Sequence, residues 1–356
     1  MTTSEPVCFV VRYFTVGGLE RVVLSLANAF VERGVDVSVV VLYNDERNAL
    51  ISELDPRVKV HLLGGPIRAR MQQLRSLTRG KIVHIHFGDG DILPLVRYAL
   101  RDRKVVVSYH SVYRHIRSWL KNRVDQLCNL HTPQVIAVSE AVRDFCTQDV
   151  GLPSAKITVI PNGVRIRPAP ERPSTGGPLT AIALASLYPH KNQVVLLEGL
   201  KLARDRGANV RLRVIGDGSS MADLYSACLR LGLRESVDWY GAVWRQDLVH
   251  PLLASSDLFV SASTYEGLPI SILEGMAHGL PMLLSDIPPH REACGAAASY
   301  FPARDPARFA SELVRLCADE QGRAQARLAS KQRVMKFDLD AAVDQHFSVY
   351  SAFAAT

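Results

Sequence analysis

The sequence predicts an α/β protein built from two doubly wound domains. Three observations lead to this fold class. Short continuous apolar runs recur along the chain, helical patterns lie between them, and a stretch rich in proline and glycine, 161–178, interrupts the alternation near the middle. Continuous apolar runs are typical of parallel strands buried on both faces. The length of 356 residues also suits about two domains.

The first half is expected to form one domain over residues 1–163. The first helix is indicated by apolar residues at helical spacing from Leu19 to Phe30, and Gly34 ends this pattern. Further helices are predicted near 68–79 and at 91–102, 114–127 and 139–149. The apolar runs predict strands at 7–11, 35–42, 82–87, 105–109, 135–138 and 157–160.

The second half repeats the strand–helix pattern after a linker. We interpret residues 164–178 as the linker and 179–337 as the second domain, and we expect a last helical segment within 338–356. Strands are predicted at 179–185, 210–215, 237–240, 258–260, 281–284 and 299–301. Ligands of doubly wound folds bind at the carboxyl ends of the strands, so the loops there are expected to carry the chemistry.

The composition excludes several classes of protein. It is 47% hydrophobic and 22% charged, as in ordinary globular proteins. The sequence holds no uninterrupted apolar stretch of about 18 residues, which a spanning helix needs. The N-terminus lacks the basic and apolar regions of a signal peptide. The six cysteines form no CxxC pair, so we expect reduced thiols in a cytoplasmic protein rather than disulfides or a zinc site.

The positive charge is concentrated in the first half of the chain. The net charge is +7, and residues 1–163 hold 21 basic and 15 acidic residues. Residues 68–81 and 97–123 are the most basic segments, with Asp102 as their only acid. Trp119 and Leu120 lie among these charges, as on an interfacial helix. We therefore expect an anionic membrane surface as a partner. Nucleic acid is the rival, but no recognised nucleic-acid-binding motif accompanies the charge.

Two glycine-containing turns join predicted strands to predicted helices. Gly17-Gly18 follows the first strand, and Gly216-Asp217-Gly218 has the corresponding place in the second half. Glycine lets a backbone approach a ligand closely, and a helix N-terminus favours an anion. Both turns lack the third glycine of the dinucleotide fingerprint. A nicotinamide-dependent oxidoreductase is therefore an alternative that these turns do not support.

The segment from Ser263 to Ala277 carries the strongest signal. Pro269 is predicted to be the first residue of a helix, whose free amides, including those of Leu268 and Ile270, would face an anion. Glu266 lies in the loop just before this helix and Glu274 lies inside it. Carboxylates accept hydrogen bonds from hydroxyls and amides hold phosphate, so the segment suits a polyhydroxylated, phosphorylated ligand.

Lys191 lies at the start of a predicted helix over 192–206. A cation there opposes the helix dipole, which indicates that an anion lies between them. His110 ends a predicted strand and is a candidate pocket residue.

A metal site is conceivable in the first half. His84 and His86 share one face of a strand, with Asp89 and Asp91 close behind. We interpret the Asp-Gly-Asp triplet instead as the end of a strand and the cap of the next helix, and we expect no metal.

The order of these motifs resembles the retaining family 4 glycosyltransferases (GT4), whose fold is GT-B. The resemblance covers nearly the whole chain. It is carried by Gly17 to Val22, the strand that ends in His110, Ala137 to Glu140, Ile160 to Val164, Lys191-Asn192, Gly216 to Gly218, and the E-x7-E motif from Glu266 to Glu274. The family implies two Rossmann-like domains facing a central cleft. The first would bind the acceptor and the second the nucleotide sugar, and the last helix would cross back onto the first domain.

The resemblance also implies an activity and roles for residues. A hexose would pass from a UDP-, GDP- or ADP-sugar to an acceptor in bacterial polysaccharide synthesis, without a metal. The basic segments place the protein at the cytoplasmic face of the inner membrane, where the acceptor would be a saccharide or a lipid-linked glycan. The implied catalytic residues are His110 beside the transferred sugar, Lys191 at the diphosphate and Glu266 at the hexose. Glu274 would hold the ribose. The implied donor-binding residues are Gly17, Gly18, Arg21, Ser186, Gly216, Gly218, Val243, Gly267, Leu268, Pro269, Ile270 and Glu274.

One residue departs from the family pattern. Ser186 stands where the family usually has Arg, so one diphosphate contact is missing or comes from elsewhere, with Arg21 as the candidate. This departure leaves open a non-catalytic homologue that binds a nucleotide sugar.

Overall fold

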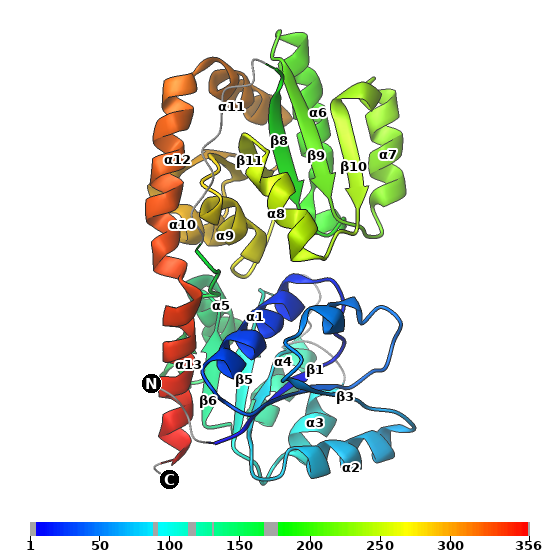
Figure 1. Ribbon diagram of the computed structural model, residues 1–356, viewed down its shortest axis with the longest axis vertical. Coiled ribbons are helices and arrows are strands. Elements are labelled where there is room, and N and C mark those ends of the chain that lie inside the picture. The colour runs from blue at the N-terminus through cyan, green and yellow to red at the C-terminus, as the bar shows by residue number, and fades with distance from the viewer. Residues whose placement is uncertain (1–4, 88–91, 113–118, 130–131, 167–176, 355–356) are drawn as a thin grey trace. The chain divides into compact units, whose positions relative to one another are not determined.

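The computed structural model describes residues 5–87, 92–112, 119–129, 132–166 and 177–354 (Figure 1). The chain divides into two compact units. Unit 1 comprises 1–163 and 337–356, and unit 2 comprises 164–336. Each unit contains one parallel sheet, which confirms the predicted fold class.

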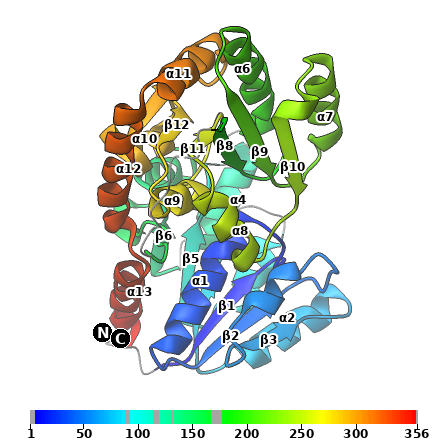
Figure 2. The same ribbon diagram turned by 45° about the horizontal axis from the view of Figure 1, so that its top comes forward.

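Unit 1 contains a seven-stranded sheet in the order β3-β2-β1-β4-β5-β6-β7, and Figure 2 shows β1, β2 and β3 side by side. Every residue of β1, β2, β4 and β5 is buried, as the continuous apolar runs predict. The order reverses between β1 and β4, and this switch point is where doubly wound folds bind ligands. The strands are β1 (Val7–Val11), β2 (Val37–Val41), β3 (Lys59–Leu62), β4 (Ile82–Ile85), β5 (Val105–Tyr109), β6 (Gln134–Ala137) and β7 (Ile157–Val159).

The helices of unit 1 connect these strands. Strand β3 and the 3-10 turn Ala49–Glu53 have no counterpart in the sequence prediction. The helices are α1 (Gly18–Glu32), α2 (Ile67–Leu77), α3 (Leu93–Ala99), α4 (Trp119–Asn129), α5 (Glu140–Asp144), which a π-helical turn extends, and α13 (Leu339–Ala354).

Helix α13 packs into the core of unit 1, although it is far from the rest of that unit in sequence. The rings of Phe30 and Phe347 lie 4.6 Å apart between centroids. Arg33 of unit 1 forms ion pairs with Asp340 at 2.8 Å and with Asp344 at 2.9 Å. Phe347 is fully buried, so α13 supplies part of the core as well as surface pairs.

Unit 2 contains a six-stranded sheet in the order β10-β9-β8-β11-β12-β13, with its switch point between β8 and β11. The strands are β8 (Leu179–Leu184), β9 (Val210–Ile215), β10 (Val237–Gly241), β11 (Leu258–Ser261), β12 (Met282–Ser285) and β13 (Ala298–Phe301). The helices are α6 (Gln193–Asp205), α7 (Met221–Arg230), α8 (Gln246–Ala254), α9 (Ile270–Ala277), α10 (Pro288–Cys294), α11 (Pro306–Ala318) and α12 (Glu320–Val334).

The six cysteines are all free. Within the described ranges, no helix has both the length and the apolar character needed to cross a bilayer.

Candidate active site

The structure brings Lys191 and Glu266 together at the switch point of unit 2. Lys191 lies in the loop after β8 and Glu266 in the loop after β11. The ammonium Nζ of Lys191 lies 2.6 Å from Oε1 of Glu266, and their side chains are only 15% and 11% exposed. Because β8 and β11 are neighbours on either side of the reversal in strand order, this pair occupies the place where such folds bind ligands.

The surroundings of Glu266 favour its ionised form. Burial by itself would raise the pKa of its carboxyl, but the charge and hydrogen bond of Lys191 lower it, with smaller contributions from His290 and Ser263, and the net direction is downward. His290 is fully buried on α10, and it belongs to none of the sequence motifs described above. Removing one member of such a pair would leave the other charge uncompensated.

Asn192 holds the two switch-point loops together. Its backbone is in the left-handed region with a φ of 56°, and its side-chain amide donates to the carbonyl oxygens of Ala262 at 3.3 Å and Ala303 at 2.7 Å. The amide of Thr264 also donates to the carbonyl of His190 at 2.8 Å. The presence of asparagine at this position is the one sequence feature that indicates a left-handed backbone, because asparagine tolerates this conformation better than most other residues.

The glycines of the turn after β9 make room for the protein's own backbone. A Cβ on Gly216 would lie 1.8 Å from the carbonyl oxygen of Ala185, and one on Gly218 would lie 2.4 Å from that of Leu187. The φ of Gly216 is also 143°. The amide of Leu187 donates to the carbonyl of Asp217 at 2.9 Å. These glycines are therefore needed for packing whether or not they also contact a ligand.

Helix α9 carries Glu274, whose side chain is nearly buried. Gln246 Nε2 donates to Glu274 Oε1 at 3.3 Å, a partner that the sequence analysis missed. A Cβ on Gly275 would lie 2.8 Å from the ring of Phe259, so this glycine lets α9 pack against β11. Pro269 is the cap of the helix rather than its first residue.

The other donor-binding candidates of unit 2 lie in loops. Gly267 and Leu268 are buried between β11 and α9. The carbonyl of Ser186 accepts from Gln193 Nε2 at 3.0 Å. Val243 is half-buried in the loop after β10.

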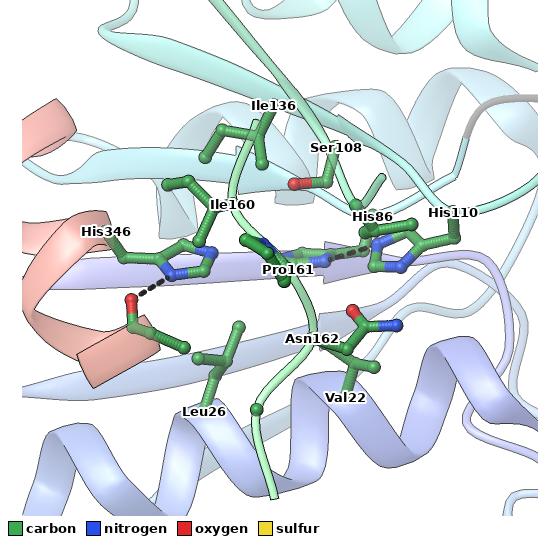
Figure 3. A pocket seen from close by; sticks show the side chains of 13 residues that line it. Val22, Leu26, His86, Ser108, His110, Ile136, Ile160, Pro161, Asn162 and His346 are labelled. Carbon is green, nitrogen blue, oxygen red and sulfur yellow. Dashed lines mark hydrogen bonds between the residues drawn. The ribbon is translucent and has the colours of Figure 1, made fainter. Parts of the chain in front are cut away.

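Unit 1 contains a cluster of histidines at its own switch point, of which His84, His86 and His346 are buried and His110 is partly buried (Figure 3). His86 Nδ1 lies 3.0 Å from His110 Nε2. His84 contacts the hydroxyl of Tyr350 through Nδ1 at 2.6 Å and that of Ser108 through Nε2 at 2.7 Å. A small pocket beside the cluster is lined by Val22, Leu26, His86, Ser108, His110, Ile136, Val138, Ile160, Pro161, Asn162, Gly163, Ala342 and His346.

Burial keeps these histidines neutral. It lowers the pKa of His110 to about 3 and that of His346 to about 4. The pKa values of His84 and His86 are lowered in the same direction for the same reason. His110 is therefore a hydrogen-bonding group with a neutral ring at physiological pH. Its Nδ1 is buried and has no partner among the described residues.

Gly17, Gly18 and Arg21 lie where β1 leads into α1. Gly17 is the cap of α1 and Gly18 is its first residue. The carbonyl of Gly17 accepts from the amide of Arg21 at 3.0 Å, and the Arg21 side chain is buried.

Two protein families match the chain in consecutive segments. Residues 16–167 match Glycosyltransferase Family 4, and residues 178–319 match Glycosyl transferases group 1. The chain belongs to the family 4 glycosyltransferases. It is accordingly a hexosyltransferase with the GT-B fold. This finding confirms the resemblance and disfavours the oxidoreductase alternative.

Two sequence relatives of this chain are named as glycosyltransferases, and a solved structure shares its fold. The chain is 28% identical to the GDP-mannose:cellobiosyl-diphosphopolyprenol alpha-mannosyltransferase of Xanthomonas campestris, over 98% of this chain and 97% of that protein. It is 29% identical to the Escherichia coli UDP-Gal:alpha-D-GlcNAc-diphosphoundecaprenol alpha-1,3-galactosyltransferase, over 44% and 43% of the two chains. The structure of Anabaena HepE with UDP-glucose matches with a TM-score of 0.82 at 20% identity, over 98% of this chain and all of that one.

His84 and His86, which were considered as metal ligands, contact protein groups: His84 the hydroxyls of Tyr350 and Ser108, and His86 the ring of His110. In the part of the chain that the structure describes, no three or more histidine, cysteine or acidic side chains are grouped so as to hold a metal ion. Asp89 and Asp91 lie outside the described residues.

The basic segments of the glycosyltransferase are not uniformly exposed. Arg97 is buried, and its Nε donates to the carbonyl of Cys128 at 3.3 Å. The prediction that Arg97 belongs to a basic surface was therefore wrong. Arg75 and Arg103 both form ion pairs with Asp102, at 2.9 and 3.0 Å. Helix periodicity alone did not show which basic residues face inward. Arg114 and Arg117 lie outside the described residues.

The apolar residues of the same region are exposed. Trp119 is 75% and Leu120 63% exposed at the start of α4. Large exposed apolar side chains beside basic residues are the pattern of a helix that lies on a membrane surface.

Proposed function

We propose that this GT4 enzyme is a retaining transferase. It moves a hexose from a nucleotide diphosphate sugar to a lipid-linked glycan in bacterial polysaccharide biosynthesis. The observation that carries the proposal is the nearly buried pair of Lys191 and Glu266 at the switch point of unit 2. The two relatives named above use GDP-mannose and UDP-galactose as donors and diphospholipid-linked saccharides as acceptors. These names support the donor and acceptor classes for this chain.

In the proposed reaction, the bond between the anomeric carbon and the diphosphate oxygen breaks. Lys191 and the amides that begin α9 stabilise the negative charge that grows on the leaving diphosphate. The acceptor hydroxyl attacks from the face that the diphosphate leaves, so the anomeric configuration is kept, and the hydroxyl proton passes to the diphosphate. No metal takes part in this scheme.

The remaining residues bind and orient the donor in this scheme. Glu266 accepts hydrogen bonds from hexose hydroxyls and Glu274 from the ribose. The loops at Gly216 and Val243 face the base, and His110 contacts the transferred sugar. Gly17, Gly18 and Arg21 complete the diphosphate site, with Arg21 supplying the cation that Ser186 does not.

We further propose that the enzyme acts as a peripheral protein on the cytoplasmic face of the inner membrane. Support for this placement comes from the exposed Trp119 and Leu120 and from the described basic residues of 68–81 and 97–123, apart from the buried Arg97. An enzyme bound to the membrane surface would meet a lipid-linked acceptor there.

A thermal-shift screen of UDP-, GDP- and ADP-sugars tests the donor class, because a ligand that binds the native state raises its unfolding midpoint. The donor that binds is then incubated with a prenyl-diphosphate saccharide. We expect a product with the anomeric configuration of the donor. An inverted product would contradict the retaining mechanism. Donor binding with neither transfer nor donor hydrolysis would favour the non-catalytic homologue.

A further inference from the structure

A groove in unit 1 has no role in the scheme above. Its volume is about 340 Å³, and it is lined by Tyr43, Gly65, Pro66, Ile67, Arg70, Ile92 and Leu95. Tyr43 follows β2, and Gly65 and Pro66 lie between β3 and α2. The groove is therefore at the carboxyl ends of the strands, the edge at which doubly wound domains bind ligands.

Arginines stack on a pair of tyrosines beside this groove. The rings of Tyr13 and Tyr43 are stacked with their centroids 5.1 Å apart. The guanidinium of Arg70 lies 4.7 Å from the centroid of Tyr43, and that of Arg12 lies 5.8 Å from the same centroid. Stacking on an aromatic ring fixes the plane of a guanidinium and leaves its N–H edge available for an oxygen ligand.

Arg12 and Arg70 provide positive charge that no carboxylate compensates within the described residues. The nearby Arg47 differs, because its Nη2 lies 2.6 Å from Oδ2 of Asp45. The Nε of Arg70 is buried and has no hydrogen-bond partner in the described ranges. The protein itself therefore does not satisfy this N–H group, which can donate to an oxygen of a ligand. The two guanidiniums, one of which carries this donor, match the several oxygens of a phosphate or diphosphate.

The rim of the groove is apolar. Ile67 is 38% exposed on α2 and Leu95 46% exposed on α3. Ile92, which is buried, also lines the groove. A small sugar phosphate would leave this apolar rim without a partner. The combination of cations and apolar side chains instead fits an amphiphile with an anionic head.

We propose that this groove binds the diphosphate group and the first isoprene units of a prenyl-diphosphate-linked acceptor. Arg12 and Arg70 hold the diphosphate oxygens, and Ile67 and Leu95 contact the lipid. This assignment rests on the proposed function, because it gives a place to the lipid-linked acceptor. It does not use Lys191, Glu266 or any other residue assigned to the donor.

The test is direct binding of farnesyl diphosphate to the full-length protein, below the micelle concentration of this lipid. The Arg70→Ala variant is compared with Arg68→Ala, which removes the same charge from an exposed position on the same helix. We expect Arg70→Ala to weaken binding roughly tenfold or more and Arg68→Ala to change it less than about twofold. Equal losses in the two variants would overturn the proposed site.

Inorganic pyrophosphate tests the anionic head of the ligand separately from its lipid. Pyrophosphate is expected to bind more weakly than farnesyl diphosphate and to be sensitive to Arg70→Ala. The Leu95→Gln variant is expected to weaken the binding of farnesyl diphosphate and to leave the binding of pyrophosphate unchanged. This variant tests the groove even if Arg70→Ala does not fold. Pyrophosphate binding as tight as that of farnesyl diphosphate would overturn the lipid assignment.

Measuring donor binding in the same variants distinguishes a failure of the groove assignment from a failure of the proposed function. The thermal shift caused by the nucleotide sugar should be unchanged in Arg70→Ala. If the wild type binds farnesyl diphosphate in the groove but neither binds nor hydrolyses any nucleotide sugar, the proposed function fails while the groove assignment stands. If transfer proceeds and Arg70→Ala leaves the KM for a prenyl-linked acceptor unchanged, the groove assignment fails alone.

Discussion

The ammonium of Lys191 and the carboxylate of Glu266 neutralise each other across the switch point of unit 2, 2.6 Å apart and nearly excluded from water. Each is the partner that makes burial of the other tolerable. An incoming diphosphate would share the ammonium with the carboxylate. The pair therefore contributes both to the stability of unit 2 and to the proposed reaction. Substitutions can separate the effect on the free energy of unfolding from the effect on turnover.

Replacing Lys191 with alanine should lower kcat more than it raises the KM for the donor, because negative charge on the diphosphate grows as the bond breaks. It should also lower the free energy of unfolding by about 3 kcal/mol, since Glu266 loses its partner. Adding Glu266→Gln should restore stability but not turnover. Lys201→Ala, which breaks an exposed pair with Asp205, is the control and should cost below ~1 kcal/mol. Unchanged kcat in Lys191→Ala would contradict the assigned role.

Replacing Glu274 with glutamine should preserve the fold, because Gln246 can still donate to the amide oxygen. Losing a charge-assisted hydrogen bond to the donor typically costs ~1.5–3 kcal/mol, or roughly tenfold or more in donor affinity. The measurements are the donor KM and the thermal shift with the nucleotide sugar. Glu198→Gln, an exposed change on α6, serves as the matched control. Equal kinetics in the two variants would remove Glu274 from the donor site.

Chelation should have little effect on the reaction. We expect kcat measured in EDTA to match kcat in untreated buffer, and added Mn²⁺ to give no increase. Loss of activity in EDTA and its recovery with Mn²⁺ would return attention to His84, His86, Asp89 and Asp91 as metal ligands.

Acid should destabilise unit 1 through its buried histidines. The pKa of His346 is lowered to about 4 from an ordinary 6.5, so between these values the unfolded chain binds a proton that the folded chain does not. The free energy of unfolding should therefore fall as the pH drops below 6.5, by on the order of 1 kcal/mol per pH unit for each such histidine. Urea midpoints from pH 7.5 to 5 measure this effect. His346→Gln should reduce the slope more than His61→Gln, a change at a partly exposed histidine. Equal slopes would contradict the prediction.

Binding to lipid vesicles tests the proposed attachment of the protein to an anionic membrane surface. The protein should sediment with liposomes containing phosphatidylglycerol at low salt and remain in solution at high salt. It should not bind to neutral vesicles. Each basic residue near the surface contributes about 1 kcal/mol at best, so Lys121→Ala should weaken binding about fivefold or less. Lys201→Ala on unit 2 is the control. Binding that is indifferent to salt, or equal to both vesicle types, would rule out electrostatic attachment.

Sequence predicted those parts of the fold in which one local pattern fixes the structure. Strands β1 and β5 occupy the predicted residues, because continuous apolar runs leave little doubt about burial on both faces. Strand β3 escaped prediction because it is a short edge strand with no buried residue. Lys191 and Glu266 were each singled out, but their pairing depends on which strands become neighbours in the sheet.

Contacts between distant segments were beyond any local pattern. His84 and Tyr350 are 266 positions apart, and nothing near either residue signals the other. Arg97 was misplaced on the surface because its burial depends on packing of α3 against α4. Such features are set by tertiary structure rather than by spacing along one element.

The path of the chain through unit 1 has a consequence for biosynthesis. Unit 2 is one continuous segment, whereas unit 1 is interrupted after Gly163 and resumes at Phe337. A ribosome releases residues in order, and domains generally fold as units during synthesis. The core around Phe30 therefore cannot be completed until Phe347 emerges, long after the strands of unit 1 are made. Unit 2 can be complete by then, so the unit whose synthesis begins first is the last to finish folding.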